Sequence, residues 1–247
     1  RYAPEGEVPL AANLSVTFNQ PMVALTGLAD LSKLPVPVTL SPQPAGQWRW
    51  VGTKTLVFEP LAEAGSMAAG RFPMATTYTV EIPAGTTSAT GGKLAEAVTF
   101  AFTTPPPQVQ TAWPQEGPTQ RDPLIFVAFD QRISPEAVLE TIKATTGNTV
   151  FPLRLATADE ISADETVSQS AKRSLEGRWL VFRPVEPFPG DSQVTITVGP
   201  GTPSLEGPLT TTEPYTFSFR TYGPLRILMH QCGWGGECAP FTPWHIR

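Results

Sequence analysis

Short stretches in which apolar and polar residues alternate recur along the chain. Residues 14–18, 78–82 and 98–102 place Leu, Val, Phe, Tyr or Ile at every second position. Alternation with a period of two predicts β-strands that bury one face and expose the other. The segments between these stretches are rich in Gly and Pro, which predicts turns and long connections.

The alternating pattern occurs twice in the same order, which indicates an internal duplication. The offset between copies is nearly constant: 111 residues for Asn19 and Asp130, 124 for Phe58 and Phe182, 116 for Gly85 and Gly201, and 117 for Phe102 and Phe219. We therefore predict two homologous units, residues 1–104 and 105–222, and the start of a third β domain at 223–247. The prolines in 105–107 and 222–224 then mark stiff linkers.

A unit of roughly 110 residues built from short alternating strands predicts an antiparallel β-sandwich of Ig-like or fibronectin-like architecture. We therefore expect an all-β chain of tandem antiparallel sandwiches. Composition supports this expectation, because 28 of the 247 residues are proline, and proline interrupts helices and central strands. Trp48 and Trp50 are expected to pack on or beside the first core, and the alternative is an exposed recognition patch.

Two stretches depart from the strand pattern. Ser134, Pro135 and the apolar residues after them predict a short helix with an N-cap and a proline in its first turn; a counterpart at 25–34 is weaker. The polar segment 156–176 is interpreted as an inserted loop. Its carboxylates are of the type that binds calcium, but we favour a solvated loop because they lack EF-hand spacing. These carboxylates are Asp159, Glu160, Asp164 and Glu165.

Charge and residue types argue against several classes of function. The net charge is −5 and like charges do not form runs, so neither nucleic acid nor a lipid surface is an expected partner. Residues 1–229 contain no His and no Cys, which excludes catalytic triads and His-ligated metals there. Phosphate-loop and nucleophile-elbow motifs do not occur either. We therefore expect no catalytic, cofactor-binding or metal-binding residues, and we expect that the protein is not an enzyme.

The two cysteines, Cys232 and Cys238, lie close together in the sequence. We favour a disulfide between them, because three glycines in the intervening segment allow a tight loop and the protein otherwise has the character of an extracytoplasmic one. Zinc ligation by both cysteines with His230 and His245 is a second possibility, although the gap of five residues between the cysteines is wider than usual. Two reduced cysteines are the third.

Several segments resemble the N-terminal part of bacterial alpha-2-macroglobulins. They are residues 18–22 (FNQPM), 47–58 (QWRWVGTKTLVF) and 72–86 (FPMATTYTVEIPAGT), and the second unit matches more loosely. Residues 238–240 (CAP) before Trp244 resemble the entry to a further macroglobulin-like domain. The resemblance implies macroglobulin-like sandwich domains in a large periplasmic protein, often a lipoprotein anchored in the inner membrane. Such proteins trap proteases through a bait region, and many carry a Cys-Gly-Glu-Gln thioester.

Neither working part is placed in this chain, since Cys232-Gly233 is followed by Trp234-Gly235 and does not match the thioester motif. The resemblance therefore implies a structural N-terminal scaffold fragment of a protease-trapping inhibitor. Its partners would be proteases, through the full-length protein, and other domains of the same chain, with a membrane tether through an N-terminal lipid outside this fragment. Two alternatives stay open. One is a pair of Ig-like spacer or adhesion modules of a bacterial cell-surface protein, and the other is a carbohydrate-binding module that uses Trp48, Trp50 or Trp113.

Overall fold

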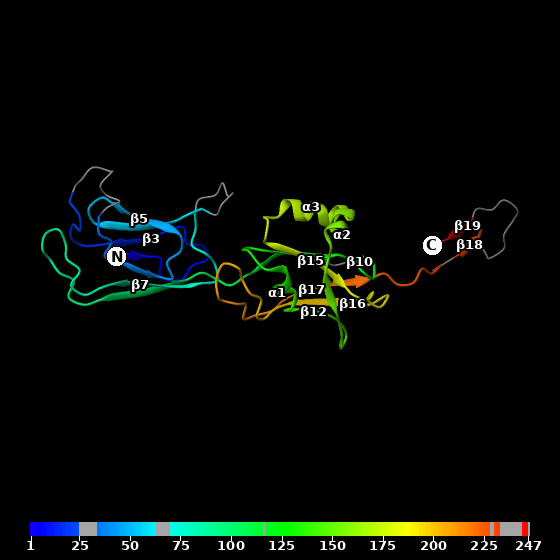
Figure 1. Cartoon of the computed structure of the whole chain (residues 1–247). Coiled ribbons are helices and arrows are strands. Elements are labelled where there is room, and N and C mark those ends of the chain that lie inside the picture. Colours follow the sequence, from blue (N-terminus) through cyan, green and yellow to red (C-terminus); the bar gives the residue numbers. More distant parts are fainter. Residues whose placement is uncertain (25–33, 63–69, 116, 228–229, 233–243, 247) are drawn as a thin grey trace.

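The computed structural model shows two β-sandwich domains that lie one after the other, end to end (Figure 1). It describes residues 1–24, 34–62, 70–115, 117–227, 230–232 and 244–246. We call the sandwich up to Thr104 domain 1 and the sandwich from Pro105 to Tyr222 domain 2. The prediction of an all-β chain of tandem antiparallel sandwiches is confirmed. Among the described helices, none is both long and apolar enough to cross a membrane.

Domain 1 consists of two four-stranded sheets, with strand orders β1-β3-β6-β5 and β2-β8-β7-β4. Neighbouring strands are antiparallel except for the short parallel pair β2–β8. The strands are β1 (Tyr2–Ala3), β2 (Gly6–Glu7), β3 (Leu14–Thr17), β4 (Thr39–Ser41), β5 (Gly46–Val51), β6 (Thr55–Pro60), β7 (Thr77–Ile82) and β8 (Val98–Thr103).

Domain 2 repeats this topology. Its sheet β14-β15-β11-β9 matches β5-β6-β3-β1, and its sheet β10-β17-β16-β12-β13 matches β2-β8-β7-β4 with β13 added. Even the parallel pair recurs, as β10–β17. The strands are β9 (Val109–Trp113), β10 (Pro118–Thr119), β11 (Ile125–Phe129), β12 (Ile142–Thr146), β13 (Thr149–Phe151), β14 (Leu153–Leu155), β15 (Trp179–Pro184), β16 (Gln193–Val198) and β17 (Tyr215–Thr221).

Each domain has its own hydrophobic core, formed by the inward residues of the alternating strands. Phe58 in domain 1 and Phe182 in domain 2 are both fully buried. They also occupy the same place in the sheet, since Phe58 lies opposite Leu14 of β3 and Phe182 lies opposite Ile125 of β11. The duplication seen in the sequence is therefore a duplication of structure.

The helices of domain 2 confirm one prediction and correct another. Helix α1 (Pro135–Leu139) begins after the N-cap Ser134 with proline in its first turn, as expected. The interpretation of 156–176 as a loop is wrong, because α2 (Ala158–Ala163) and α3 (Glu165–Arg173) occupy most of it. Thr157 caps α2 in a capping box with Glu160, and Asp164 caps α3. Polar residues at these two caps made the segment look like a loop.

Helices α2 and α3 cover the outer face of the sheet that contains β11 (Figure 1). Val167 of α3 is fully buried and packs in a small cluster with Phe126 and Val181 of the sheet. As a result every residue of β11 is buried, whereas the equivalent strand β3 exposes Thr17 and half-exposes Ser15. Domain 2 thus has a third layer. Among the described residues of domain 1, no helix covers the equivalent sheet.

The tryptophan expectation is confirmed. Trp50 is buried in the core of domain 1, and Trp48 packs edge-on against Phe58 with ring centroids 5.1 Å apart. Trp113 of β9 is partly buried and packs against the cluster that contains Val167 of α3. None of these three indoles therefore forms a wholly exposed sugar-binding platform.

After domain 2, strands β18 (His230–Cys232) and β19 (Trp244–Ile246) pair antiparallel. Cys238 lies outside the described residues, and the side chains of Cys232, His230 and His245 are not described, so the disulfide and the zinc alternative stay predictions. Most of the weaker helix expected at 25–34 also lies outside the described residues.

Candidate functional site

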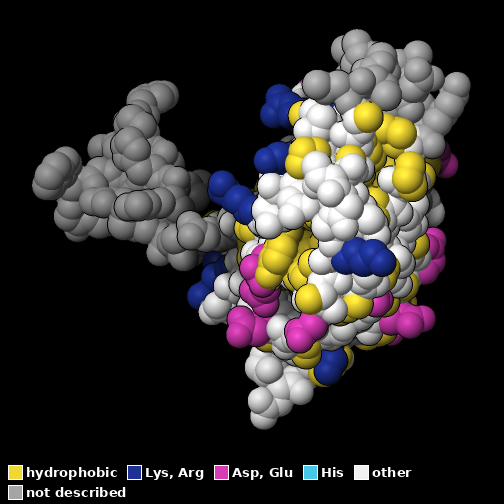
Figure 2. Space-filling view, turned by 90° about the vertical axis from the view of Figure 1, so that its left-hand side faces the viewer, with side chains coloured by type: hydrophobic (Ala, Val, Ile, Leu, Met, Phe, Trp, Pro, Cys, Tyr) yellow, Lys and Arg dark blue, Asp and Glu magenta, His cyan; other side chains and the backbone are white. Residues whose placement is uncertain are grey.

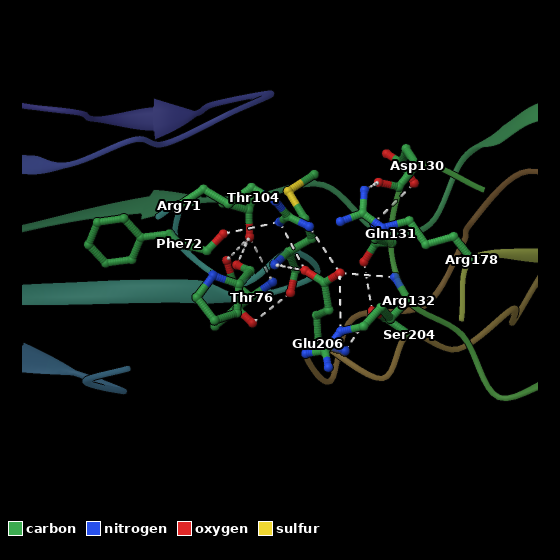
Figure 3. Close-up of polar contacts among 12 residues, drawn as sticks. Arg71, Phe72, Thr76, Thr104, Asp130, Gln131, Arg132, Arg178, Ser204 and Glu206 are labelled. Atoms are coloured by element: carbon green, nitrogen blue, oxygen red, sulfur yellow. Dashed lines mark hydrogen bonds and ion pairs between the residues drawn. The ribbon is translucent and has the colours of Figure 1, made fainter. Parts of the chain in front are cut away.

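The two domains meet at a polar joint, built from a loop of domain 2 and a turn of domain 1 (Figure 3). The loop is residues 202–211, between β16 and β17, and we call it the docking loop. The turn is residues 71–76, directly before β7, and we call it the receiving turn. Met74, Ala75 and Thr76 of the receiving turn are 5%, 0% and 5% exposed.

Glu206 of the docking loop is the centre of the joint (Figure 3). Its side chain is 1% exposed, and its carboxylate forms an ion pair with Arg71 of domain 1 at 2.9 Å. The same carboxylate accepts the backbone N–H of Met74 at 3.1 Å and that of Arg132 at 2.9 Å. A carboxylate held this far from water needs such partners, because a buried charge without them is strongly destabilising. The joint supplies partners from both domains.

The environment of Glu206 favours its ionised form. Burial acts to raise the pKa of this carboxyl, but the backbone N–H groups of Arg132 and Met74 and the guanidinium of Arg71 outweigh it and lower the pKa below its ordinary value. A lowered pKa in the folded protein means that ionised Glu206 stabilises the joint above the ordinary pKa. This stabilisation is lost as pH falls through the folded-state pKa.

Backbone contacts close the joint beside the carboxylate. Leu209 donates its N–H to the carbonyl of Ala75 at 2.9 Å. Gly207 lies so close to domain 1 that a Cβ there would fall 2.1 Å from Thr76 Oγ1 and 2.4 Å from the carbonyl oxygens of Met74 and Ala75. Glycine is therefore needed for this close approach of two backbones.

A second set of hydrogen bonds anchors the docking loop to domain 2 and to the linker. Gln131 is fully buried; its Nε2 donates to the carbonyl of Pro105 at 3.2 Å, and its Oε1 accepts Ser204 Oγ at 2.7 Å. Ser204 Oγ in turn accepts the N–H of Glu206 at 2.9 Å. The linker, the start of domain 2 and the docking loop are thus fixed to one another.

The receiving turn is held by Thr104, the last residue before the linker. Thr104 Oγ1 accepts the N–H of Thr76 at 3.1 Å and donates to the carbonyl of Pro73 at 2.9 Å. Ala75 has a φ of +55°, and its N–H donates to the carbonyl of Pro105 at 2.9 Å. The turn therefore takes its shape from domain 1 and the linker and does not depend on the docking loop.

Two of the four acidic residues considered for calcium, Glu160 and Asp164, have structural roles. Glu160 forms ion pairs with Arg154 at 2.6 Å and Arg183 at 2.8 Å, and these contacts lower its pKa. Asp164 accepts the N–H of Val167 as a helix cap. In the part of the chain that the structure describes, no group of three or more His, Cys, Asp or Glu residues is arranged to hold a metal ion.

The joint residues were not predicted from the sequence. Gln131 and Ser204 had a recognisable signal, because Gln20 and Ser88 stand at the equivalent positions of domain 1 and form the same 2.7 Å hydrogen bond. Glu206 and Arg71 had no comparable signal. They are 135 residues apart in sequence, and their contact depends on how two complete domains are placed.

Comparisons with solved structures give low overall similarity. The chain aligns with an L,D-transpeptidase from Mycobacterium tuberculosis H37Rv at 19% identity and TM-score 0.26, covering 64% of this chain and 58% of that one. An L,D-transpeptidase from Mycobacterium smegmatis aligns at 12% identity and TM-score 0.25, covering 89% and 86%. The plexin A4 extracellular region aligns at 10% identity and TM-score 0.24, covering 92% and 15%. At these TM-scores the similarity identifies neither a function nor a shared arrangement of domains.

Comparisons of sequence are more informative about the family. A curated relative named circularly permutated Ras protein 2, from Dictyostelium discoideum, is 26% identical over 223 residues, which cover 84% of this chain but 6% of that protein. The chain thus spans a small part of the length of this relative. A family model described as bacterial Ig-like domain matches residues 3–104 and again residues 105–221. The chain therefore belongs to the bacterial Ig-like domain family and contains two copies of that domain.

Proposed function

We propose that residues 1–222 act as a rigid two-domain spacer within a larger protein of the cell envelope or cell surface. The observation that carries this proposal is the buried Glu206 in the joint. Two Ig-like domains connected by a flexible linker would leave such a carboxylate in water, where an ion pair contributes little. Here the carboxylate is paired and buried across the joint, so the relative orientation of the domains is part of the folded structure.

The remaining features of the joint support the same role. The linker between the domains contains three consecutive prolines, residues 105–107, which restrict the backbone. Gly207 and Leu209 bring backbone against backbone, which fixes both distance and rotation. The proposal gives the two domains a mechanical role, to hold the neighbouring parts of a larger protein at a set distance and angle, and gives them no catalytic role.

NMR relaxation of backbone amides tests this proposal. We expect both domains to report one common rotational correlation time, as a single elongated body does. The Gly207→Val variant is the matched flexible control, because its side chain overlaps Thr76 Oγ1 and the Met74 and Ala75 carbonyls while leaving both cores intact. Two different, shorter correlation times in the unaltered chain would show independent domains and overturn the proposal.

A finer proposal is that the larger protein is an alpha-2-macroglobulin-like protease trap in the periplasm, anchored in the inner membrane. Its support is the sequence resemblance at residues 18–22, 47–58 and 72–86, together with a rigid arrangement suited to a cage. The test is incubation of the whole protein with trypsin or elastase, and then gel filtration of the mixture. Protease retained by the whole protein, with none retained stoichiometrically by residues 1–247, is the expected result. Failure of the whole protein to retain protease would leave a general spacer and refute the trap.

A further inference from the structure

The C-terminal end of domain 2 builds a second copy of the receiving turn. Asp191 has a φ of +54° and donates its N–H to the carbonyl of Tyr222 at 3.2 Å. In domain 1, Ala75 has a φ of +55° and donates its N–H to the carbonyl of Pro105 in the same way. Thr221 Oγ1 accepts the N–H of Ser192 at 3.0 Å and donates to the carbonyl of Pro189 at 2.6 Å, the two bonds that Thr104 makes in domain 1. Residues 188–192 and 221–222 thus reproduce residues 72–76 and 104–105, and we call 188–192 the second turn.

The two turns differ in what covers them. The middle of the receiving turn is buried beneath the docking loop. In the second turn, Gly190 and Asp191, which correspond to the buried Met74 and Ala75, are exposed. Gly190 corresponds to Met74, whose N–H binds the Glu206 carboxylate. Within the described residues the N–H of Gly190 has no hydrogen-bond acceptor, so it is open to an incoming group.

A guanidinium accompanies each turn, although the two come from different parts of the sequence. In domain 1, Arg71 donates to the carbonyl of Phe72 at 3.3 Å and pairs with Glu206. In domain 2, Arg121 donates to the equivalent carbonyl of Phe188 at 2.6 Å. Among the described residues Arg121 has no carboxylate partner, whereas the nearby Arg220 is paired with Asp191 at 2.9 Å. The second turn therefore presents a positive charge and a free N–H in the arrangement that binds a carboxylate in the joint.

The geometry points to one occupant. We infer that an Ig-like domain located after residue 222 docks on the second turn, and that its docking loop places a carboxylate against the Gly190 N–H and the Arg121 guanidinium. Two apolar residues directly after domain 2 fit this occupant, because Leu225 and Ile227 are 103% and 66% exposed at alternate positions. Alternation of this kind is expected of a strand whose apolar face is covered by its own domain.

A second copy of this chain fits the second turn less well. The far end of domain 1 carries a loop equivalent to the docking loop, with Ser88 bonded to Gln20 as Ser204 is to Gln131. Thr90 follows Ser88 by two positions, as Glu206 follows Ser204 in domain 2. Its hydroxyl donates to Gln20 Oε1 at 3.1 Å. This end of domain 1 (Figure 2) carries both Lys or Arg and Asp or Glu side chains, but its loop lacks the required carboxylate. Charge complementarity therefore favours a different domain.

The inference goes beyond the spacer proposal and is tested on an extended chain. In the extended chain, Tyr222 is followed directly by a second copy of residues 106–221. The added copy of domain 2 carries the docking loop and therefore serves as the probe. Hydrogen exchange at Gly190 is then measured by NMR and compared with exchange in the unextended chain. We expect Gly190 to exchange at least about tenfold more slowly in the extended chain, as its N–H becomes buried and bonded.

The matched control carries Glu206→Gln in the added copy alone. We expect this control to return Gly190 toward the rate of the unextended chain. Met74 reports the first joint in the same samples, and its slow exchange shows that the original domains are folded and docked. An unchanged Gly190 rate with Met74 still protected would overturn the inference and leave the spacer proposal intact. Protection of Gly190 that survives Glu206→Gln would also overturn it, because docking would then not use the carboxylate.

Discussion

Replacement of Glu206 by Ala should open the joint without unfolding either domain. The substitution removes the carboxylate that joins Arg71, Met74 and Arg132. Glu206 belongs to neither hydrophobic core, so the packing inside each sandwich is unchanged. What changes is the balance between a docked and an undocked arrangement of two folded domains.

The size of the effect depends on burial. Breaking a buried ion pair by removing one partner costs about 3–5 kcal/mol when the other charge stays buried. The Arg71 side chain is 18% exposed, and it regains water when the joint opens, so the lower end of this range applies. A change of about 3 kcal/mol shifts the equilibrium between docked and open forms by roughly a hundredfold.

Hydrogen exchange at Leu209 measures this shift directly, because its N–H binds the Ala75 carbonyl across the joint and keeps that acceptor in the variant. We expect exchange about a hundredfold faster in Glu206→Ala, with core amides such as that of Phe102 unaffected. The matched control is Glu213→Ala, which removes an exposed carboxylate from the same β16–β17 connection. Equal Leu209 rates in the unaltered chain and in Glu206→Ala would refute the idea that this ion pair holds the domains together.

Three further predictions concern the joint, the helical layer of domain 2 and the cysteines. Because the pKa of Glu206 is lowered, the protection factor of Leu209 should be constant above the ordinary value of 4.5 and decrease as pH falls below it, and Glu206→Gln should abolish this dependence. Val167→Ala should destabilise domain 2 by about 2 kcal/mol in urea unfolding, since the side chain is fully buried, whereas Val150→Ala at a 61% exposed position should change little. Thiol titration of the denatured chain should find no free sulfhydryl if Cys232 and Cys238 form the predicted disulfide, and two free thiols would contradict it.

The strands were predictable because their signal is local. Alternation at residues 14–18 and 98–102 specifies which face is buried, and the repeat of Phe58 at Phe182 specifies that the same sheet is built twice. Helices α2 and α3 were missed for an equally physical reason. Their segment is polar, and the contribution of Val167 becomes visible only against the sheet residues it packs on, Phe126 and Val181.

The joint was not predictable from the sequence, since its residues acquire their roles through tertiary placement. Glu206 stands in a loop of ordinary polar composition, where an exposed carboxylate is the normal expectation. It becomes buried because Gly207 allows the loop to lie against the receiving turn. The turn is ready to accept it because Thr104 and the linker fix the Met74 N–H in position. Each of these conditions depends on a contact between segments that are distant in sequence.

A joint held by a carboxylate differs in its consequences from one held by an apolar patch. Each domain completes a separate core, and an undocked domain exposes at the joint a carboxylate, a guanidinium and backbone groups that water can satisfy. Undocked domains therefore expose mainly polar groups at the joint, together with the Met74 side chain, and large apolar surfaces are what promote misassembly in tandem repeats. The same joint depends on ionisation of Glu206, so acid should loosen the arrangement of the domains before it disrupts the sandwiches. Rigidity between such domains is then set by a few polar contacts, and the shape of the chain can change while its folds persist.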